Sequence, residues 1–275
     1  MAAQFSTIKV EKLGAIARLT LARPESANAL NQTMLGEIGN ALDEIERDSD
    51  IRAVIVTGAG AAFSSGFDLK EQMERRPSGV AAWEPLLRKD FNTIMRFWHF
   101  PRPTIAAVRG PCLAGACELA LACDMTIASE DAFFGEPELK FGAGIVAMIL
   151  PWLAGPKIAK EIILLGEDRI PAARAREIGL VNRVVPAAEL DATTLTIAHH
   201  LAAIDPNLVQ ETKRAINRAY EARNMLAALE EALAIDLAIE GAGSPDKIAF
   251  MDIARREGLK AALAWRDARF PSDVP

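Results

Sequence analysis

Short strand-like runs separated by helical stretches recur through the first two-thirds of this 275-residue chain. The runs are rich in Val, Ile, Leu, Ala and Thr, and they cover residues 17–21, 53–57, 104–108, 124–128 and 180–185. Alternation of this kind favours an α/β fold in which strands are joined by helical crossovers. The chain is long enough to bury a sizeable core, so we expect one large domain or a domain with an appendage.

Helical periodicity dominates two parts of the chain. Between Asn31 and Arg47 the apolar residues follow one helix face, which predicts an amphipathic helix; they are Met34, Leu35, Ile38, Leu42 and Ile45. After about residue 190, helical patterns fill residues 187–201, 206–223, 225–240, 245–256 and 258–267. We therefore expect a core over residues 1–195 and a helical region over 196–275. Periodicity alone does not decide between an oligomerisation element and a second helical layer on the core.

Charge and composition argue against several classes of partner. A formal net charge of −6 disfavours nucleic-acid and anionic-membrane surfaces, and the longest apolar runs are too short to cross a bilayer. The N-terminal residues lack the pattern of a secretory signal, so we expect a cytoplasmic protein with reduced thiols. Neither the cysteines nor the histidines are spaced like metal ligands, so we expect no metal; they are Cys112, Cys117, Cys123, His99, His199 and His200.

Two glutamates lie in apolar, glycine-punctuated surroundings. Glu118 belongs to the run at residues 113–124, and Glu138 to the run at 133–139. Carboxylates are rarely buried without a partner, because removing water from them costs several kcal/mol or raises their pKa. A pair of such carboxyls can divide the roles of general acid and general base. Glu136, two residues before Glu138, could share its side of an extended segment and raise its pKa, but we expect a solvated surface residue, since most glutamates are exposed.

Two turns are candidate sites for holding an oxyanion. The strand at 104–108 leads into a turn of small residues and a helix that starts near Ala114, where unpaired backbone amides are positively polarised. Gly115 would allow a ligand carbonyl to approach this backbone closely. The second turn ends at Gly66, and the amide of Phe67 after it could point to the same place. Either turn alone is typical of ordinary packing, and only the two together indicate a site for an oxyanion.

Several motifs in matching order resemble the enoyl-CoA hydratase/isomerase (crotonase) superfamily. They are AFSSGFDLKE at 62–71, LAGACELALACD at 113–124, FFGEPEL at 133–139 and IGLVNRVVP at 178–186. The resemblance extends from ARPESANAL at 22–30 to the closing segment at 256–270. It implies a crotonase-like spiral of ββα units, a C-terminal helical region used for trimerisation, and an acyl-CoA thioester as ligand, as in fatty acid metabolism. Trimers of this kind can pair into hexamers.

The resemblance also implies a role for individual residues. The amides of Phe67 and Gly115 match the family's oxyanion hole, and Glu118 and Glu138 match the two glutamates that hydratases use on one water. One carboxylate would deprotonate the water that adds to the β-carbon, while the other protonates the α-carbon. No metal or redox cofactor is implied. The residues that match coenzyme A contacts are Ala27, Ala29, Leu30, Asp68, Leu69 and Lys70, although the first three also fit a plain hydrophobic turn.

Two departures from the hydratase pattern leave the acyl group and the reaction open. Residues 139–155 are shorter and more apolar than the glycine-rich stretch usual after the second glutamate, and Phe67 replaces a small residue. Between residues 72 and 98 we expect a mobile loop and a helix, whose apolar residues either cover the acyl chain or pack in the core.

Several other activities remain open at this stage. A Δ3-Δ2-enoyl-CoA isomerase would need Glu138 alone, and a decarboxylase, thioester hydrolase or carbon–carbon lyase would use the same oxyanion hole. A serine hydrolase with Ser64 or Ser65 would need a histidine base, and a non-catalytic acyl-CoA binder would need no chemistry at all.

Overall fold

The structure, a computed structural model, describes residues 5–270. Its main sheet has six strands in the order β1, β2, β3, β4, β6 and β9, which span Ile8–Leu13, Ile16–Leu21, Ala53–Gly58, Thr104–Val108, Met125–Ser129 and Arg183–Val185. β1 and β2 are antiparallel, and every other neighbouring pair in this sheet is parallel. The predicted α/β class is therefore correct, and each of the five predicted runs overlaps a strand of this sheet.

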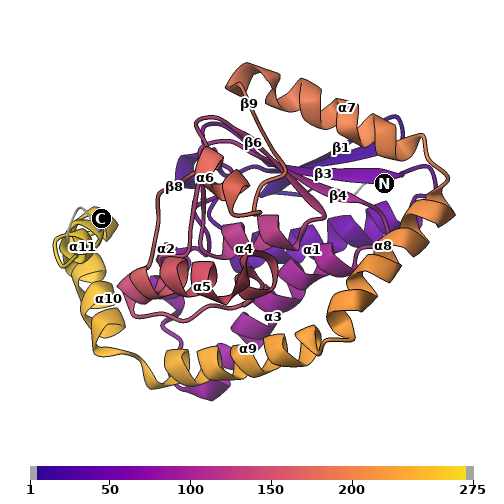
Figure 1. Cartoon of the computed structure of the whole chain (residues 1–275). Helices are drawn as coiled ribbons and strands as arrows, with labels where there is room; N and C mark the ends of the chain where they lie inside the picture. The colour runs from indigo at the N-terminus through magenta and orange to yellow at the C-terminus, as the bar shows by residue number, and fades with distance from the viewer. Residues whose placement is uncertain (1–4, 271–275) are drawn as a thin grey trace.

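Helices cover both faces of the main sheet (Figure 1). α7 (Leu190–Ala202) lies on one face, where Leu190 and Ala198 pack on alternate residues of the strands, such as Ile55 and Ile105. The opposite face packs against α1 (Gln32–Arg47), α3 (Val80–His99) and α4 (Gly115–Ala122). Because parallel strands are buried on both faces, their sequences are nearly continuous apolar runs, and for this reason the sequence predicts these strands.

A second, smaller sheet positions the segments that carry the candidate site. Its strands β5, β7 and β8 span Pro111–Leu113, Phe133–Gly135 and Ile170–Pro171. β5 and β7 are parallel, with Leu113 opposite Gly135. Parallel strands end at the same edge of a sheet, so the start of α4 after β5 and the glutamates after β7 come together there.

The predicted helix after Asn31 is present and begins where its sequence indicates. Asn31 is the N-cap of α1, and its side-chain oxygen accepts a hydrogen bond from the backbone amide of Met34 at 2.8 Å. All five apolar residues predicted to share a face are buried. The helix therefore covers the sheet with the face that its periodicity predicts.

The C-terminal part is helical as predicted. α8, α9, α10 and α11 span Pro206–Glu221, Met225–Ala242, Pro245–Glu257 and Leu259–Asp267. α9 packs along α3, while α10 and α11 form a separate arm at one side of the molecule (Figure 1). The division expected between residues 195 and 196 falls inside α7, which is part of the sheet's cover. Whether the helices after α7 act as an oligomerisation region stays a prediction.

The remaining elements include one strand that sequence periodicity does not reveal. β1 is an edge strand with only Ile8 buried, so it lacks an apolar pattern, and Gly14 with φ of 63° makes the turn into β2. The other helices, α2, α5 and α6, span Leu69–Arg75, Leu150–Leu165 and Ala172–Glu177. Within residues 5–270, we find no helix with the length and apolarity that a bilayer crossing requires.

We expect the Asn31→Ala variant to lower the free energy of unfolding by about 1 kcal/mol, because it removes the N-cap of α1. Urea denaturation followed by circular dichroism measures this difference. Asn31→Ser keeps a capping oxygen and should retain most of the stability. Equal losses in the two variants would show that the cap hydrogen bond contributes little.

Candidate active site

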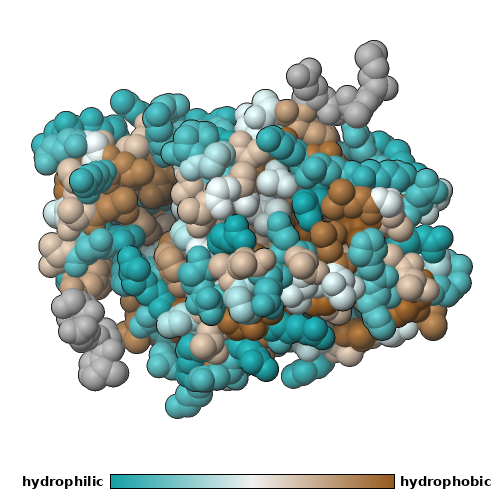
Figure 2. All heavy atoms as spheres, turned by 90° about the horizontal axis from the view of Figure 1, so that it is seen from above, coloured by the Kyte–Doolittle hydropathy of each residue, from teal (hydrophilic) through white to brown (hydrophobic). Residues whose placement is uncertain are grey.

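A cavity of about 880 Å³ lies between the α10–α11 arm and the rest of the molecule. In Figure 2, where this arm is on the left, the surface is hollowed beside it. Seven of the ten residues predicted for the site line this cavity: Ala27, Ala29, Phe67, Asp68, Leu69, Lys70 and Glu138. Leu30, Gly115 and Glu118 do not line it, and all three are buried.

The two predicted oxyanion turns are in direct contact. Gly66 has φ of 88°, and a Cβ placed on it would lie 2.6 Å from the Cβ of Ala114 and 2.7 Å from the carbonyl oxygen of Leu113. A Cβ on Gly115 would lie 2.3 Å from the ring of Phe67. At Gly66 only glycine fits beside the neighbouring backbone, and at Gly115 a Cβ would force the ring of Phe67 to move, so the two turns approach as closely as the sequence predicts.

The amides of Phe67 and Gly115 are free to bind a ligand. Among the hydrogen bonds of residues 5–270, neither amide has an acceptor. Gly115 is the first residue of α4, where a helix amide has no partner within the helix. Two adjacent unpaired amides can stabilise one oxygen that gains negative charge.

Ala114 holds the turn before α4 in an uncommon conformation. Its φ and ψ are 55° and −138°, a region that residues with a Cβ rarely adopt and that costs of order 1–3 kcal/mol. Its amide donates to the carbonyl of Gly135 in β7 at 2.8 Å, and its own carbonyl accepts from the amides of Cys117 and Glu118. These bonds fix the turn against the strand that leads to Glu136.

Glu118 is buried and oriented by backbone amides. Its side chain is 1% exposed, and its two carboxylate oxygens accept hydrogen bonds from the amides of Val146 at 3.2 Å and Ala147 at 2.9 Å. Burial and the charge of Glu138 raise the pKa of Glu118 well above its usual value, whereas the two amide bonds act in the opposite direction. The carboxyl therefore has a fixed position and a strong tendency to hold a proton.

Glu136 is buried, which corrects the expectation of a solvated surface residue. Its side chain is 1% exposed. The amide of Glu136 donates to the carbonyl of Glu167 at 2.8 Å, and this bond holds the segment of Glu136 beneath the loop that follows α5. Burial, then the charges of Glu138 and Glu118, raise the pKa of Glu136 well above the usual range. Cys117 and Glu138 are its near neighbours, but neither gives its carboxyl oxygens a well-formed hydrogen bond.

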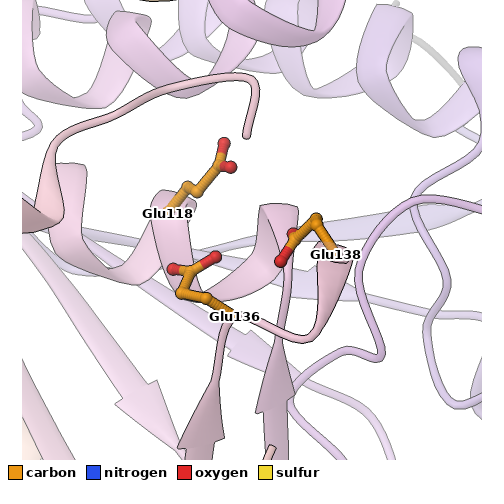
Figure 3. Close-up of side chains that lie close together, drawn as sticks. All are labelled: Glu118, Glu136 and Glu138. Carbon is orange, nitrogen blue, oxygen red and sulfur yellow. The ribbon is translucent and has the colours of Figure 1, made fainter. Parts of the chain in front are cut away.

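Glu118, Glu136 and Glu138 form one cluster, in which the carboxyls face a common space (Figure 3). One oxygen from each lies within 4.8 Å of the others. Burial raises the pKa of Glu138 to about 8, and no donor satisfies either of its carboxyl oxygens in the described part of the chain. Three carboxyls this close will share protons and titrate together. The same oxygens could also hold a metal ion; the absence of a metal requirement stays a prediction.

The loop before α1 borders the cavity and is held by residues that sequence reasoning missed. Asn28, with φ of 54°, donates to the carbonyls of Ala59 and Ala62. Arg23 donates to the carbonyl of Ala29 at 2.6 Å and to the carboxylate of Asp68 at 2.7 Å. Nothing in the local sequence marks either residue, because the partners Ala59, Ala62 and Asp68 are distant along the chain.

The residues predicted for coenzyme A differ in availability. The carboxylate of Asp68 is already used, since it caps α2 by accepting from the amides of Lys70 and Glu71 in addition to its pair with Arg23. Lys70 is exposed at the cavity and makes no ion pair within residues 5–270. Of the two, the side chain of Lys70 is the better candidate for a phosphate-bearing ligand.

Residues 72–98 both line the cavity and pack in the core, and whether they cover an acyl chain stays a prediction. They form the end of α2 and most of α3. Trp83 and Leu87 line the cavity, whereas Phe91, Ile94 and Phe97 are buried in the main core. Asp236 in α9 also lines the cavity and was not predicted, since it is one charge among many on a long helix.

The serine hydrolase alternative gains no support. Ser64 is completely buried, and its hydroxyl accepts from the amide of Gly66 at 3.2 Å. His199 and His200 lie on α7, and His99 ends α3. In the part of the chain that the structure describes, no hydrogen bond joins a serine to a histidine.

Comparisons with known proteins identify relatives over nearly the whole chain. The model of the enoyl-CoA hydratase/isomerase family matches residues 11–238. A short-chain-enoyl-CoA hydratase of Clostridium acetobutylicum is 38% identical over 79% of this chain and 84% of its own length. The crystal structure of an enoyl-CoA hydratase/isomerase from Xanthobacter autotrophicus Py2 has 73% identity and a TM-score of 0.97, covering 98% of this chain and 100% of that one. An enoyl-CoA hydratase structure from Bacillus anthracis has 30% identity and a TM-score of 0.74, covering 92% and 97%.

The carboxyl cluster predicts an unusual dependence of stability on pH. An acid whose pKa is higher in the folded than in the unfolded chain binds more protons when folded, so the free energy of unfolding falls as pH rises from about 4.5 through the folded pKa. We expect Glu136→Gln to reduce this fall between about pH 5 and about pH 8, by at most about 1.4 kcal/mol per pH unit for one proton. Urea denaturation at several pH values measures the slope.

Glu37→Gln is the matched control. Burial tends to raise the pKa of Glu37, but hydrogen bonds from Thr7 and Ser6 outweigh this and hold it at about 2. The control should lose stability by a similar amount across the tested range, leaving the slope unchanged. The same slope in Glu136→Gln and the unsubstituted protein would mean that Glu136 does not hold a proton in the cluster.

Proposed function

This chain belongs to the enoyl-CoA hydratase/isomerase family, and we propose that it adds water across the α,β double bond of an enoyl-CoA thioester. The observation that carries the proposal is the juxtaposition of two kinds of group at one sheet edge. Phe67 and Gly115, whose amides are free, are in contact. Glu118 lies one helical turn after Gly115 in α4, and Glu138, which follows the neighbouring strand, lies in the same cluster as Glu118. Hydration needs both.

The two amides would bind the thioester oxygen. Addition of water to the β-carbon moves charge through the conjugated system onto this oxygen, which makes an enolate. Donors that are already in place stabilise such charge without having to reorganise, and removal of one typically costs about 2.7–4 kcal/mol. The contact of Gly66 with Ala114 and of Phe67 with Gly115 keeps both donors fixed.

The two glutamates would divide the proton transfers. Glu118 would receive the proton of the attacking water: its two backbone hydrogen bonds fix the orientation of its carboxyl and favour the ionised form, against the burial and the charge of Glu138 that raise its pKa. The scheme requires that the proton of the cluster lies on Glu138 when Glu118 acts as the base. Glu138 lacks such donors and has a pKa of about 8, so it is suited to deliver a proton to the α-carbon. Isomerisation would need only one of these carboxyls, and a second carboxyl held by two amides within 4.8 Å of Glu138 favours hydration.

We further propose that the coenzyme A portion passes between the loop at 23–30 and the start of α2. Ala27 and Ala29 line this side of the cavity, and Lys70 is available for phosphate. No redox or metal cofactor takes part in this scheme.

The molecule is proposed to assemble as a trimer or a hexamer. α8 and α9 expose large apolar side chains that a neighbouring copy could cover: Leu208, Ile216, Ile235 and Ile239. A cytoplasmic location stays a prediction.

The direct test is the hydration of crotonyl-CoA and of longer and aryl enoyl-CoAs, followed as loss of the absorbance of the conjugated thioester. We expect Glu118→Gln and Glu138→Gln each to lower kcat by about 10²–10⁴-fold, because each removes a proton-transfer group. Glu118→Gln should spare isomerisation of a 3-enoyl-CoA, which needs Glu138 alone. No hydration by the unsubstituted protein with any member of the panel would refute the proposal.

Gly115→Ala tests the oxyanion hole without changing a carboxyl. The added Cβ would clash with the ring of Phe67 and displace one or both amides, so we expect kcat/KM for hydration to fall by about a hundredfold. Gly39→Ala is the control, since Gly39 lies in α1 with open space around it. Activity of Gly115→Ala equal to that of this control would contradict the placement of the hole.

A further inference from the structure

Asp236 is a buried carboxyl that the hydration scheme does not use. It lines the cavity from α9, its side chain is 2% exposed, and neither of its carboxyl oxygens has a well-formed donor within residues 5–270. The amide of Gly144 lies close enough to lower the pKa of Asp236, without making a well-formed hydrogen bond to it. A buried acceptor without a donor is costly in a folded protein, so a group of this kind in a ligand cavity points to a donor on the ligand.

Asp236 borders the part of the cavity that would hold the acyl group. A Cβ placed on Gly144 would lie 2.1 Å from its Oδ1 atom, so this carboxyl lies directly on the loop whose next residues hold Glu118. Its charge also contributes to the raised pKa of both Glu118 and Glu138. Trp83 and Val146, which line the same cavity, provide apolar surface around it. Glu240, which lines the same cavity, is already paired with Lys247, so Asp236 is an acceptor on this side of the cavity that a ligand donor can still satisfy. A polar group placed in this way fixes the orientation of a ligand and selects for one functional group.

The nearby charges favour a neutral donor over a cation. Burial and then the charge of Glu240 raise the pKa of Asp236, whereas Lys247 lowers it. Lys247 is paired with Glu240 and lies 4.3 Å from the centre of the Trp83 ring, so it already supplies a cation to these two carboxyls. A second ammonium group beside Asp236 would face this lysine, whereas a hydroxyl group adds no charge.

We infer that Asp236 accepts a hydrogen bond from a hydroxyl group on the distal part of the acyl chain, which makes hydroxylated acyl-CoA thioesters the preferred ligands. The inference rests on the proposed acyl-CoA site, and it adds the chemical class of the acyl group. A site built to bind a hydroxyl discriminates strongly against the alkyl analogue, because the analogue leaves the buried acceptor unpaired.

The test is equilibrium binding of saturated acyl-CoAs, which cannot be hydrated. Calorimetry compares butanoyl-, hexanoyl- and octanoyl-CoA with their ω-hydroxy and ω-amino counterparts. We expect the hydroxylated member of at least one length to bind about tenfold or more tightly than its alkyl counterpart, and the amino member to bind no better than the alkyl. Asp236→Leu should abolish or reverse this preference, and Asp236→Asn should reduce it.

Asp90→Asn is the matched control. Asp90 is another buried carboxyl whose pKa burial raises to about 7, but it accepts from Gln32 at 2.7 Å and does not line the large cavity. This variant should keep the hydroxyl preference.

The outcomes separate the inference from the proposed function. If the unsubstituted protein hydrates enoyl-CoAs but binds no hydroxylated acyl-CoA of any tested length more tightly than its alkyl counterpart, the inference alone is overturned. This result does not depend on the folding of any variant. A hydroxyl preference that is lost in Asp236→Leu, in a protein that hydrates nothing, would refute the hydration proposal and sustain the inference. A preference that persists in Asp236→Leu, or stronger binding of the amino series, would also overturn the inference.

Discussion

The site depends on the close approach of two backbone segments, residues 66–67 and 113–115. Isolated bridges between Ser64 and Cys112 and between Leu30 and Phe67 join three loops side by side. The approach is possible because Gly66 and Gly115 have no Cβ, and Ala114 keeps its uncommon backbone angles because its amide is bonded to β7. Packing energy from the core therefore holds two amides in a position that an isolated loop would not keep.

The second constraint is electrostatic. Glu118, Glu136 and Glu138 are buried together, and no lysine or arginine forms an ion pair with any of them in the described residues. Because three negative charges cannot share a small space of low polarity, the cluster must retain protons near neutral pH. A reaction that both takes and gives a proton needs carboxyls beside the substrate that can hold and release one. Glu136, although it does not line the cavity, helps to set how many protons the other two carry.

Patterns of local spacing predicted much of the fold and part of the site. The buried strands, α1 and the C-terminal helices follow from periodicity, and the glycine turns with Glu118 and Glu138 follow from motifs. Glu136 was placed wrongly because its burial results from the segment near Glu167, which covers it from a distant part of the chain. Arg23 and Asp236 were missed for the same reason, since contacts between residues far apart in sequence give each its environment.

Residues 139–155, which depart from the usual hydratase pattern, contact both Glu118 and Asp236. The loop in this segment donates the amides of Val146 and Ala147 to Glu118, while Gly144 leaves room for the carboxyl of Asp236. One loop therefore orients the proposed catalytic base and forms the wall of the cavity beside Asp236. A change of this loop that altered that wall would also alter the orientation and proton affinity of Glu118. The proposed chemistry and specificity are therefore physically linked in this segment.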